Sequence, residues 1–392
     1  MFRFVTAGES HGQALVTWIS GLPAGLRVDL DFVNGELHRR QLGYGRGGRQ
    51  KIERDRADAI SGIRHGQTIG APVALRIENR DWENWEKALP VEDSPEFIDS
   101  KRPLTAPRPG HADLPGALKF NFHDARYVLE RASARESAAR TAAGALAKLL
   151  LAEFGIRVLS HVVAVGPERL GREAIWDEIV SICAKLDSPL RCVDAGAESK
   201  MKAAVDAALR AGDSVGGVFE VVAHGVPPGL GTHAQWDEKL DGKLAAAVMS
   251  LQAVKAVEIG SGIQAAHSPG SAVHDEIGYQ RDAAFAGFTR TRNNAGGMEG
   301  GVSNGQEIRV RGYLKPISTL RRPLQSVDFA TREPVKAAYE RSDVCVVPAA
   351  GVAGEAMVAL TLAACALEKF GGDSMAETLR NFKGYLEQLR NY

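Results

Sequence analysis

The sequence is poor in the features that mark a secreted, membrane-bound or nucleic-acid-binding protein. Only four cysteines occur in 392 residues and none forms a C-x-x-C pair, which is typical of free thiols in a reducing compartment. The 48 basic and 48 acidic side chains cancel, so no global positive field attracts nucleic acid. The N-terminus carries no apolar signal-peptide core. These absences predict a cytoplasmic protein with neither a nucleic-acid nor a membrane partner.

Long apolar runs are scarce as well. The longest candidate covers residues 344–367, where Pro348 and Glu355 interrupt a stretch rich in Ala and Gly. A charged side chain is costly within a bilayer, so we expect a strand that leads into a buried helix. The overall composition, with 44% hydrophobic and 24% charged residues, is that of a soluble globular protein with a large core.

Common cofactor and metal motifs are missing too. No G-x-G-x-x-G follows a first strand, and the sequence has no H-x-x-x-H, H-E-x-x-H or Cys/His metal-binding spacing. The sequence therefore predicts neither a Rossmann dinucleotide site nor a metal centre.

Strand and helix patterns are instead mixed along the whole chain. Ser133 and Glu136 have the spacing of a capping box, which predicts a helix that stops at Gly155. Ser374 and Glu377 predict a C-terminal helix in the same way. The other predicted helices lie near 172–186, 199–211 and 237–251, and the predicted strands at 2–5, 156–165, 217–223, 307–314 and 344–347.

One segment of the chain recurs. Residues 7–26 match residues 211–230 with eight identities in twenty positions, and five of the eight are Gly or Pro, which predicts a shared turn–strand–turn shape. No linker separates the two copies, so we expect an α+β fold in which residues 1–392 form a single domain of two pseudo-symmetric halves. Val215 occupies the position of His11 when the two copies are aligned, and an imidazole present in only one copy suggests a specific role.

Basic residues cluster in one part of this neutral chain. Glycine lets a backbone turn closely, so the interleaved glycines at 43–48 would let guanidinium groups converge on one small anion. Bidentate arginine suits carboxylate and phosphate. A solvated basic loop that pairs with surface acids is an equally good interpretation from the residues alone. The basic residues are Arg39, Arg40, Arg46, Arg49, Lys51, Arg54, Arg56 and Arg64.

Two histidines lie in loops rich in glycine. His111, in the segment 108–113, follows an irregular stretch at 80–109 that is rich in Trp, Pro and charge, and long irregular loops are commonly functional. Imidazole titrates near neutrality, which suits proton transfer. A surface position or a structural hydrogen bond is the commoner explanation for a lone histidine, and the pair His11 and His111 shifts this balance only modestly.

The C-terminal third adds three candidate segments. Residues 293–305 gather Gly, Asn and Ser, which offer backbone amides to an anion or a surface to a flat ring. Lys315 precedes Ser318 and Thr319, a cation and two hydroxyls that suit a phosphate tail. Asp343, after a predicted helical stretch, is a candidate general base or simply a cap or a salt-bridge partner of Arg341.

Taken together, these segments resemble the chorismate synthase family. Each segment is modest evidence, but they occur in family order over nearly the whole chain, so the set is highly specific. The resemblance rests on Gly8–Gly12, Arg40–Arg49, Arg108–Asp113, Arg131–Glu136, Val257–Gly260, residues 293–305, Lys315–Thr319 and Arg341–Asp343.

The resemblance implies conversion of 5-enolpyruvylshikimate 3-phosphate to chorismate and phosphate, the last step of the shikimate pathway. It implies a requirement for reduced FMN although the reaction is redox-neutral. NADPH is a candidate reductant, because Arg40 and Arg46 fall where relatives contact it. The family fold is a large β-α-β sandwich with internal pseudo-symmetry that assembles as a homotetramer, which agrees with the repeat.

The resemblance also implies roles in a 1,4-anti elimination, in which phosphate leaves C3 and a hydrogen leaves C6. His11 would donate a proton or hydrogen bond to the phosphate, His111 would protonate or hold the reduced flavin, and Asp343 would act with the flavin N5 on the C6 hydrogen. The substrate anions would be bound by Arg40, Arg46, Arg49, Arg108 and Arg135. The implied FMN contacts are Arg131, Ala132, Ser133, Gln252, Ala253, Gly300, Lys315, Pro316, Ile317, Ser318, Thr319 and Arg341.

One position departs from the family pattern. Residues 131–133 read Arg-Ala-Ser where many relatives have Arg-Ser-Ser, so one hydroxyl is missing. There is also no additional reductase domain, which leaves the source of reducing equivalents open. From the residues alone two other functions stay open: a flavin-independent enzyme that eliminates or transfers phosphate, and a basic-loop module that binds RNA or another polyanion. Activity only with reduced FMN, or salt-dependent RNA binding without turnover, distinguishes them.

Overall fold

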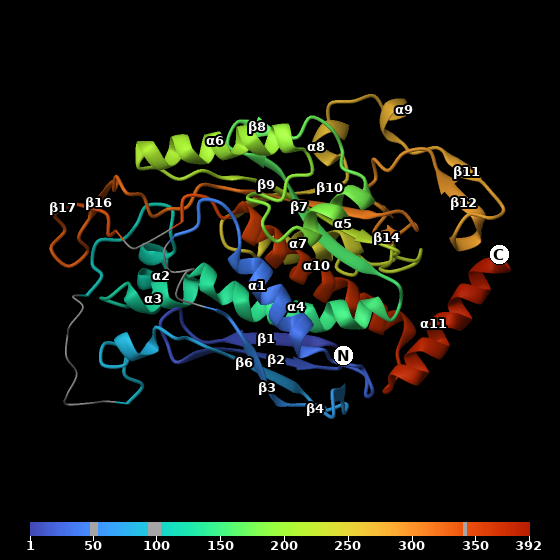
Figure 1. Cartoon of the computed structure of the whole chain (residues 1–392), viewed down its shortest axis with the longest axis horizontal. Coiled ribbons are helices and arrows are strands. Elements are labelled where there is room, and N and C mark those ends of the chain that lie inside the picture. Colours follow the sequence, from blue (N-terminus) through green and yellow to red (C-terminus); the bar gives the residue numbers. More distant parts are fainter. Residues whose placement is uncertain (48–53, 93–102, 340–342) are drawn as a thin grey trace.

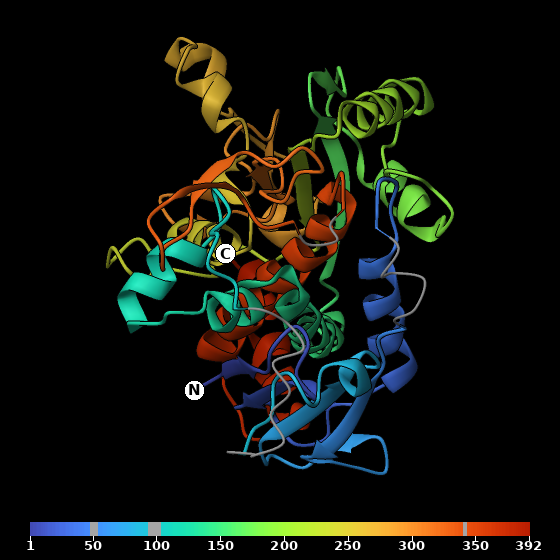
Figure 2. The same ribbon diagram turned by 90° about the vertical axis from the view of Figure 1, so that its left-hand side faces the viewer.

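Two antiparallel sheets enclose a layer of helices in the computed structural model, which describes residues 1–47, 54–92, 103–339 and 343–392 (Figures 1 and 2). The first sheet has the order β1-β2-β6-β3 and consists of Arg3–Ala7, Ala14–Ser20, Val73–Glu78 and Ala57–Ser61. The second has the order β10-β15-β9-β7-β8 and consists of Val254–Ile259, Ile308–Leu314, Gly217–His224, Arg157–Val165 and Glu168–Arg169. The predicted α+β class is confirmed.

The helix layer is built around α4 (Ser137–Ala152) and α10 (Val347–Phe370), with α1 (Leu30–Gln41) beside them. Helix α4 packs on the first sheet and α10 on the second, so the layers follow one another as sheet, helices, sheet (Figure 1). Small residues permit this packing, because a Cβ on Gly144 of α4 would lie 2.3 Å from the Cβ of Ala356 in α10.

Shorter elements extend from these layers. Four two-stranded hairpins are formed by β4 and β5 (Ile63–Arg64, Gln67–Thr68), β11 and β12 (Ile277–Tyr279, Phe288–Arg290), β13 and β14 (Met298–Glu299, Val302–Ser303), and β16 and β17 (Gln325–Val327, Pro334–Lys336). The remaining helices are η2 (Trp82–Asn84), α2 (Asp113–Phe120), α3 (Arg126–Ala132), η3 (Ala134–Glu136), α5 (Trp176–Ala184), α6 (Ala195–Ala211), α7 (Leu240–Met249), α8 (Gly262–Ala265), α9 (Gly270–Val273), η4 (Phe285–Gly287) and α11 (Met375–Arg390).

Helix α10 is long and apolar enough to cross a membrane, but 78% of its most apolar window is buried inside the protein. This burial identifies it as a core helix, as predicted. The predicted strand at 344–347 is wrong. The N–H of Val344 donates to the carbonyl of Gly45 at 2.7 Å, and its carbonyl accepts from Val215 at 3.0 Å. The backbone here is therefore bonded to two separate loops and not to a strand.

The predicted capping boxes form only in part. Ser133 accepts from the N–H of Arg135 at 3.3 Å and starts the 3-10 turn that leads into α4. Glu136 does not turn back to the cap, because it accepts from Thr6 at 2.6 Å and from Gln252 at 3.0 Å. The carboxylate of Glu136 therefore bonds to residues distant in sequence and not, as the capping box predicted, to the start of its own helix.

The helical stretch predicted before Asp343 is wrong in the residues that the structure describes there. Residues 334–336 form β17 and pair with residues 325–327. Cross-strand pairing overrides the local pattern there. The predicted helices near 172–186, 199–211 and 237–251 are all present: α5 and α7 are shorter than predicted at both ends, and α6 begins earlier, at Ala195.

The two copies of the repeated segment have similar turns around β2 and β9. Positive φ favours glycine because a Cβ is disfavoured there. The elements before the copies differ, since β1 precedes the first and α6 the second. The matching φ values are +101° and +71° at Gly8 and Gly212, +82° and +81° at Gly21 and Gly225, and +86° and +93° at Gly25 and Gly229.

A buried ionic cluster ties the helix layer to the second sheet. Glu355 of α10 accepts from Arg39 of α1 at 2.9 Å, from Ser160 of β7 at 2.6 Å and from Lys148 of α4. Burial alone would raise the pKa of Glu355, but Arg39 and Lys148 outweigh it and lower the pKa below its usual value. Arg39 therefore belongs to the core and not to an anion site.

Candidate active site

Two buried arginines share one carboxylate where α1 ends. Arg40 donates to Asp55 at 2.8 Å, and Arg135, from the turn before α4, donates to the other oxygen of Asp55 at 2.5 Å. Burial by itself would raise the pKa of Asp55, but the two guanidinium groups lower it from its usual value. The Nε of Arg40 is buried without a hydrogen-bond partner among the described residues. Two cations held by one anion leave net positive charge for an anionic ligand.

Asn79, at the end of β6, connects this pair to the loop that carries His11. Its carbonyl oxygen accepts from Arg135 at 2.8 and 3.0 Å. Its amide group donates to the backbone carbonyls of Glu9 at 3.1 Å and Gly12 at 2.6 Å. A buried side chain that bonds on both sides fixes the loop against the arginine.

The imidazole ring of His11 is fixed by a hydrogen bond along one edge and by an aromatic ring stacked on one face. Its Nδ1 lies 2.9 Å from Oε1 of Glu130, and its backbone N–H donates to Oε2 of Glu130 at 2.7 Å. The ring stacks on Trp85 at 3.9 Å between centroids. The side chain of His11 is 13% exposed, so the imidazole is enclosed but still reaches the surface.

His111 forms a second buried cluster with Arg108 and Asp113. Its Nδ1 lies 2.5 Å from Oδ1 of Asp113, and Arg108 donates to Asp113 at 2.8 Å and to Thr319 at 2.9 Å. Burial alone would raise the pKa of Asp113, but hydrogen bonds from His111 and Arg108 hold it far below its usual range. Asp113 therefore carries a negative charge at any physiological pH.

The segments predicted to contact FMN lie side by side in the network. Gln252 donates to Glu136 at 3.0 Å, next to residues 131–133. The carbonyl of Ala253 accepts from the N–H of Lys315 at 3.0 Å. The ammonium group of Lys315 in turn donates to the carbonyl of Gly110, beside His111. Residues 131–133, 252–253 and 315–319 are thus connected to both histidine loops.

Two serines attach these segments to the two copies of the repeat. Ser133 donates to Ser10, in the first copy, at 3.2 Å. Ser214, the matching residue of the second copy, donates to the carbonyl of Ile317 at 2.6 Å. Arg131 reaches the first copy as well, with hydrogen bonds to the carbonyls of Gly8 at 2.9 Å and Thr6 at 3.0 Å.

Asp343 is joined to the arginine loop. Its carboxylate pairs with Arg46 at 2.7 Å and accepts from the N–H of Gly47 at 2.5 Å. Arg46 in turn lies near enough to Arg40 to lower the pKa of that guanidinium, in addition to the larger effect of burial. Asp343 thus forms a salt bridge with Arg46; the partner that the sequence suggested, Arg341, lies outside the described residues.

Some predicted residues do not join this network. Gly300 lies in the turn between β13 and β14, a hairpin bonded to residues 229–240, as in the hydrogen bond from Leu240 to the carbonyl of Gly301 at 2.9 Å. The arginines of the predicted cluster do not all converge on one small anion, because Arg39 faces the core and three others are exposed. Arg49, Arg341 and Lys51 lie outside the described residues. The exposed arginines are Arg54, Arg56 and Arg64.

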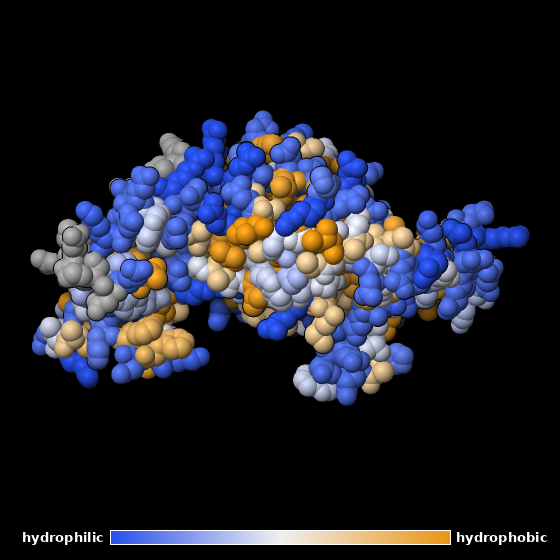
Figure 3. All heavy atoms as spheres, turned by 90° about the horizontal axis from the view of Figure 1, so that it is seen from below, coloured by the Kyte–Doolittle hydropathy of each residue, from blue (hydrophilic) through white to orange (hydrophobic). Residues whose placement is uncertain are grey.

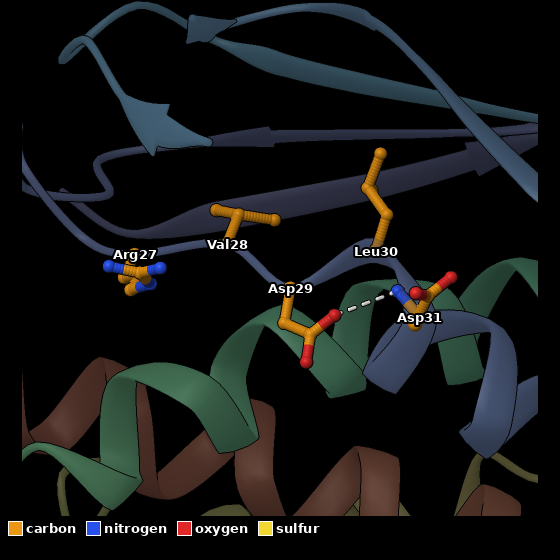
Figure 4. A pocket seen from close by; sticks show the side chains of 5 residues that line it. All are labelled: Arg27, Val28, Asp29, Leu30 and Asp31. Carbon is orange, nitrogen blue, oxygen red and sulfur yellow. Dashed lines mark hydrogen bonds between the residues drawn. The ribbon is translucent and has the colours of Figure 1, made fainter. Parts of the chain in front are cut away.

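Two depressions in the surface of the described residues lie elsewhere. One, of about 360 Å³, is lined by Arg27–Asp31, where Asp29 caps α1 by accepting from the N–H of Asp31 at 2.9 Å (Figure 4). With 12 residues α1 is roughly 18 Å long, and Arg40 lies near its other end. A second, of about 570 Å³, lies along α11. Neither contains a residue of the network, so the polar contacts and not the cavities define the site.

The geometry supports acid–base chemistry on a small anion. The network combines buried arginines with two histidines, each oriented by a carboxylate, on loops of a rigid α+β scaffold. Oriented imidazoles transfer protons, and arginines bind carboxylate or phosphate. These features define an enzyme that binds a small, multiply charged substrate and moves protons on it.

Comparisons with known proteins give the family. The chorismate synthase family profile matches residues 2–367. Chorismate synthases of Koribacter versatilis and Solibacter usitatus are each 64% identical over the full length of both chains, and that of Geobacter sulfurreducens is 54% identical. A crystal structure of a chorismate synthase, 40% identical, has a TM-score of 0.79 and covers 100% of this chain and 99% of its own. The chain belongs to the chorismate synthase family.

Membership gives the reaction. The chain is a lyase of the shikimate pathway that converts 5-enolpyruvylshikimate 3-phosphate to chorismate, in a family that uses reduced FMN. Of the three functions that the residues left open, the FMN-dependent lyase is confirmed.

Proposed function

We propose that the elimination takes place between the His11 loop, the Arg40–Arg135 pair and the His111 cluster. The observation that carries the proposal is the continuous network through Asn79, Asp55 and the 252–253 segment. It joins residues that are distant in sequence and that the family resemblance selects independently. Arg40, Arg46, Arg49, Arg108 and Arg135 bind the two carboxylates and the phosphate of the substrate.

Each acid–base residue has its own task in this scheme. His11 donates a proton to the departing phosphate, which stabilises the charge that develops on the leaving oxygen. Asp343, held by Arg46 and the N–H of Gly47, accepts the hydrogen lost from C6. His111, fixed by Asp113, holds the flavin by a hydrogen bond.

The residues present fit FMN. Arg131 and Lys315 supply two cations, and Ser133 and Ser318 supply hydroxyls, which together suit the phosphate of the flavin. Ala132, Gln252, Ala253, Gly300, Pro316, Ile317, Thr319 and Arg341 complete the proposed contacts. When bound, reduced FMN supplies transient electron density that no amino-acid side chain offers. NADPH, bound near Arg40 and Arg46, is the proposed reductant.

Anaerobic assays of single variants test these roles. His11→Ala and Asp343→Asn should each lower kcat by about 10²-fold or more, as expected for loss of a general acid or base. His111→Ala should instead raise the concentration of reduced FMN needed for turnover, because the flavin loses a hydrogen bond. His267→Ala, at an exposed position outside the network, is the matched control. A variant that folds normally and turns over at the control rate removes that residue from the mechanism. Turnover with NADPH and oxidised FMN in place of photoreduced FMN tests the reductant.

The assembly is proposed to be a cytoplasmic homotetramer. On the face opposite α4, the first sheet leaves Val5 46% exposed, and Val5 lies opposite Trp18 in the sheet. Figure 3 shows apolar residues gathered on this side of the molecule. Such a patch favours contact with another copy. Light scattering should give the mass of four 42.0 kDa chains, about 168 kDa. Val5→Lys should reduce the measured mass. A monomeric wild type contradicts the proposal.

The two halves are proposed to be pseudo-symmetric copies that diverged in function. The matching glycine conformations at both copies of the repeat support this. Only the first copy carries an imidazole, so Val215→His should not restore activity to His11→Ala. Rescue would show that the two halves are chemically equivalent.

A further inference from the structure

Glu130 is a buried carboxylate that contacts His11 and has no role in the scheme above. It lies in α3, and its side chain is 2% exposed. Its carboxylate is bonded to both the backbone N–H and the Nδ1 of His11, at 2.7 and 2.9 Å. The backbone carbonyl of Glu130 also accepts from the N–H of Ser10 at 2.9 Å. Three hydrogen bonds therefore bind this one residue to the loop of His11.

Further contacts restrict the ring of His11. Trp85 covers a face of the imidazole, and the indole N–H is itself held by Asp81 at 3.1 Å. Arg126 is another charged group nearby, 3.9 Å from Oε1 of Glu130 and 5.3 Å from the centre of the Trp85 ring. Because Glu130 lies along the Nδ1 edge, the Nε2 edge is the one directed away from α3.

We propose that Glu130 is a positioning residue that keeps the proton of His11 on Nδ1, so that His11 delivers its other proton, from Nε2, to the leaving phosphate. This inference rests on the proposed role of His11 as proton donor. An anionic acceptor at Nδ1 selects the ring form that carries a proton there.

The proton transfer balances in this arrangement. The Nε2–H bond of the imidazolium breaks and its electron pair stays on Nε2. An O–H bond forms on the phosphate oxygen as the C3–O bond breaks and gives its electron pair to that oxygen. The ring becomes a neutral imidazole that still donates from Nδ1 to Glu130. The proton lost at C6 replaces the proton consumed at the phosphate, so the overall reaction needs no other acid.

Glu130→Gln separates proton donation from hydrogen bonding. The backbone N–H of His11 can only donate, so the amide oxygen of the glutamine must face it, and the amide NH₂ then donates to Nδ1. A neutral ring with its proton on Nε2 results. This ring can still hydrogen-bond to the phosphate, but loss of its proton would leave an imidazolate. We expect kcat to fall by about 10²-fold, within the range of general acid catalysis, with KM changed by less than about threefold.

The matched control is Glu307→Gln, which alters another Glu–His pair, since Nδ1 of His224 lies 3.1 Å from Glu307. Glu130→Asp, which keeps the charge, should recover part of the lost kcat. In the His11→Ala background, Glu130→Gln should cause no further loss. Nitrogen-15 NMR of histidine-labelled protein should show a proton on Nδ1 of His11 in the wild type and a shift toward Nε2–H in Glu130→Gln.

The possible outcomes are distinct. The inference is overturned if Glu130→Gln retains the kcat of the control, if its effect adds to that of His11→Ala, or if Asp at 130 is no better than Gln. A wild-type spectrum with neutral His11 unprotonated at Nδ1 overturns it even where the glutamine variant does not fold. If His11→Ala keeps full activity, the proposed function of His11 as proton donor fails. If His11→Ala is impaired but Glu130→Gln keeps full activity, only the proposed role of Glu130 fails.

Discussion

Asp55→Asn gives a quantitative test of the buried arginine pair. The wild-type carboxylate is 1% exposed and lies between the guanidinium groups of Arg40 and Arg135, each 6% exposed. The substitution keeps the shape of the side chain but leaves two neighbouring cations without their anion. Removal of one partner from a buried ion pair typically costs about 3–5 kcal/mol. We therefore expect the free energy of unfolding at neutral pH to fall by about 3 kcal/mol.

The same contact predicts how the loss depends on pH. In the folded protein the arginines outweigh burial and hold the pKa of Asp55 below its usual value of about 3.9. A carboxylate whose pKa is lowered by folding stabilises the fold above its unfolded pKa and loses that contribution as the pH falls through the folded pKa. The difference between wild type and Asp55→Asn should therefore be complete at pH 7 and shrink below about pH 4.

Urea unfolding followed by circular dichroism measures both effects. Asp58→Asn is the matched control, because Asp58 is 59% exposed and lies 4.0 Å from Arg76, where an ion pair contributes little. A midpoint for Asp55→Asn equal to that of the control would show that the carboxylate of Asp55 does not stabilise the two buried arginines. A stability difference that grows on acidification would mean that folding raises the pKa of Asp55, against the expected effect of the arginines.

Three further predictions concern the core and the flavin site. Gly144→Ala should lower the free energy of unfolding by about 1–3 kcal/mol, because the added Cβ collides with α10. Gly384→Ala is the comparison, because a Cβ at this position in α11 meets nothing within 4 Å. It should raise the free energy of unfolding by about 0.5–1 kcal/mol. Thermal unfolding measures both, and equal effects would contradict the packing. Glu355→Gln should shift the urea midpoint downward, since the buried Arg39 and Lys148 lose an anion; an unchanged midpoint would show that the cluster adds no stability. Asp113→Asn should weaken FMN binding in a fluorescence titration, because His111 loses the carboxylate that orients it, and wild-type affinity would contradict this.

Local elements were largely predictable from the sequence. The repeat predicted the turns around β2 and β9, because positive φ selects glycine and proline fixes the chain direction. The apolar run at 344–367 predicted a buried helix, which is α10. The sequence wrongly predicted a strand at 344–347 and a return bond from Glu136 to its cap, because loops and side chains distant in sequence take these hydrogen bonds.

The candidate site was predictable only in its loops. His11 and His111 stood out because glycine surrounds them, and the family resemblance named most of the cations. Their partners carried no such signal: Glu130 is 119 residues from His11, and Asn79 is 56 residues from Arg135. A single Glu or Asn at the end of an element is unremarkable until the fold brings it to its partner. The same reason explains why Arg39, adjacent to Arg40, faces the core instead.

Anaerobic product analysis measures whether the chain performs the elimination and whether it needs reduced FMN. The purified chain is mixed with 5-enolpyruvylshikimate 3-phosphate and either photoreduced or oxidised FMN, and phosphate and chorismate are quantified in the same sample. We expect equal amounts of the two products with reduced FMN, a rate at least about 10²-fold lower for His11→Ala, and no product with oxidised FMN in the absence of a reductant. Phosphate release without chorismate, or equal turnover without reduced FMN, would contradict this expectation.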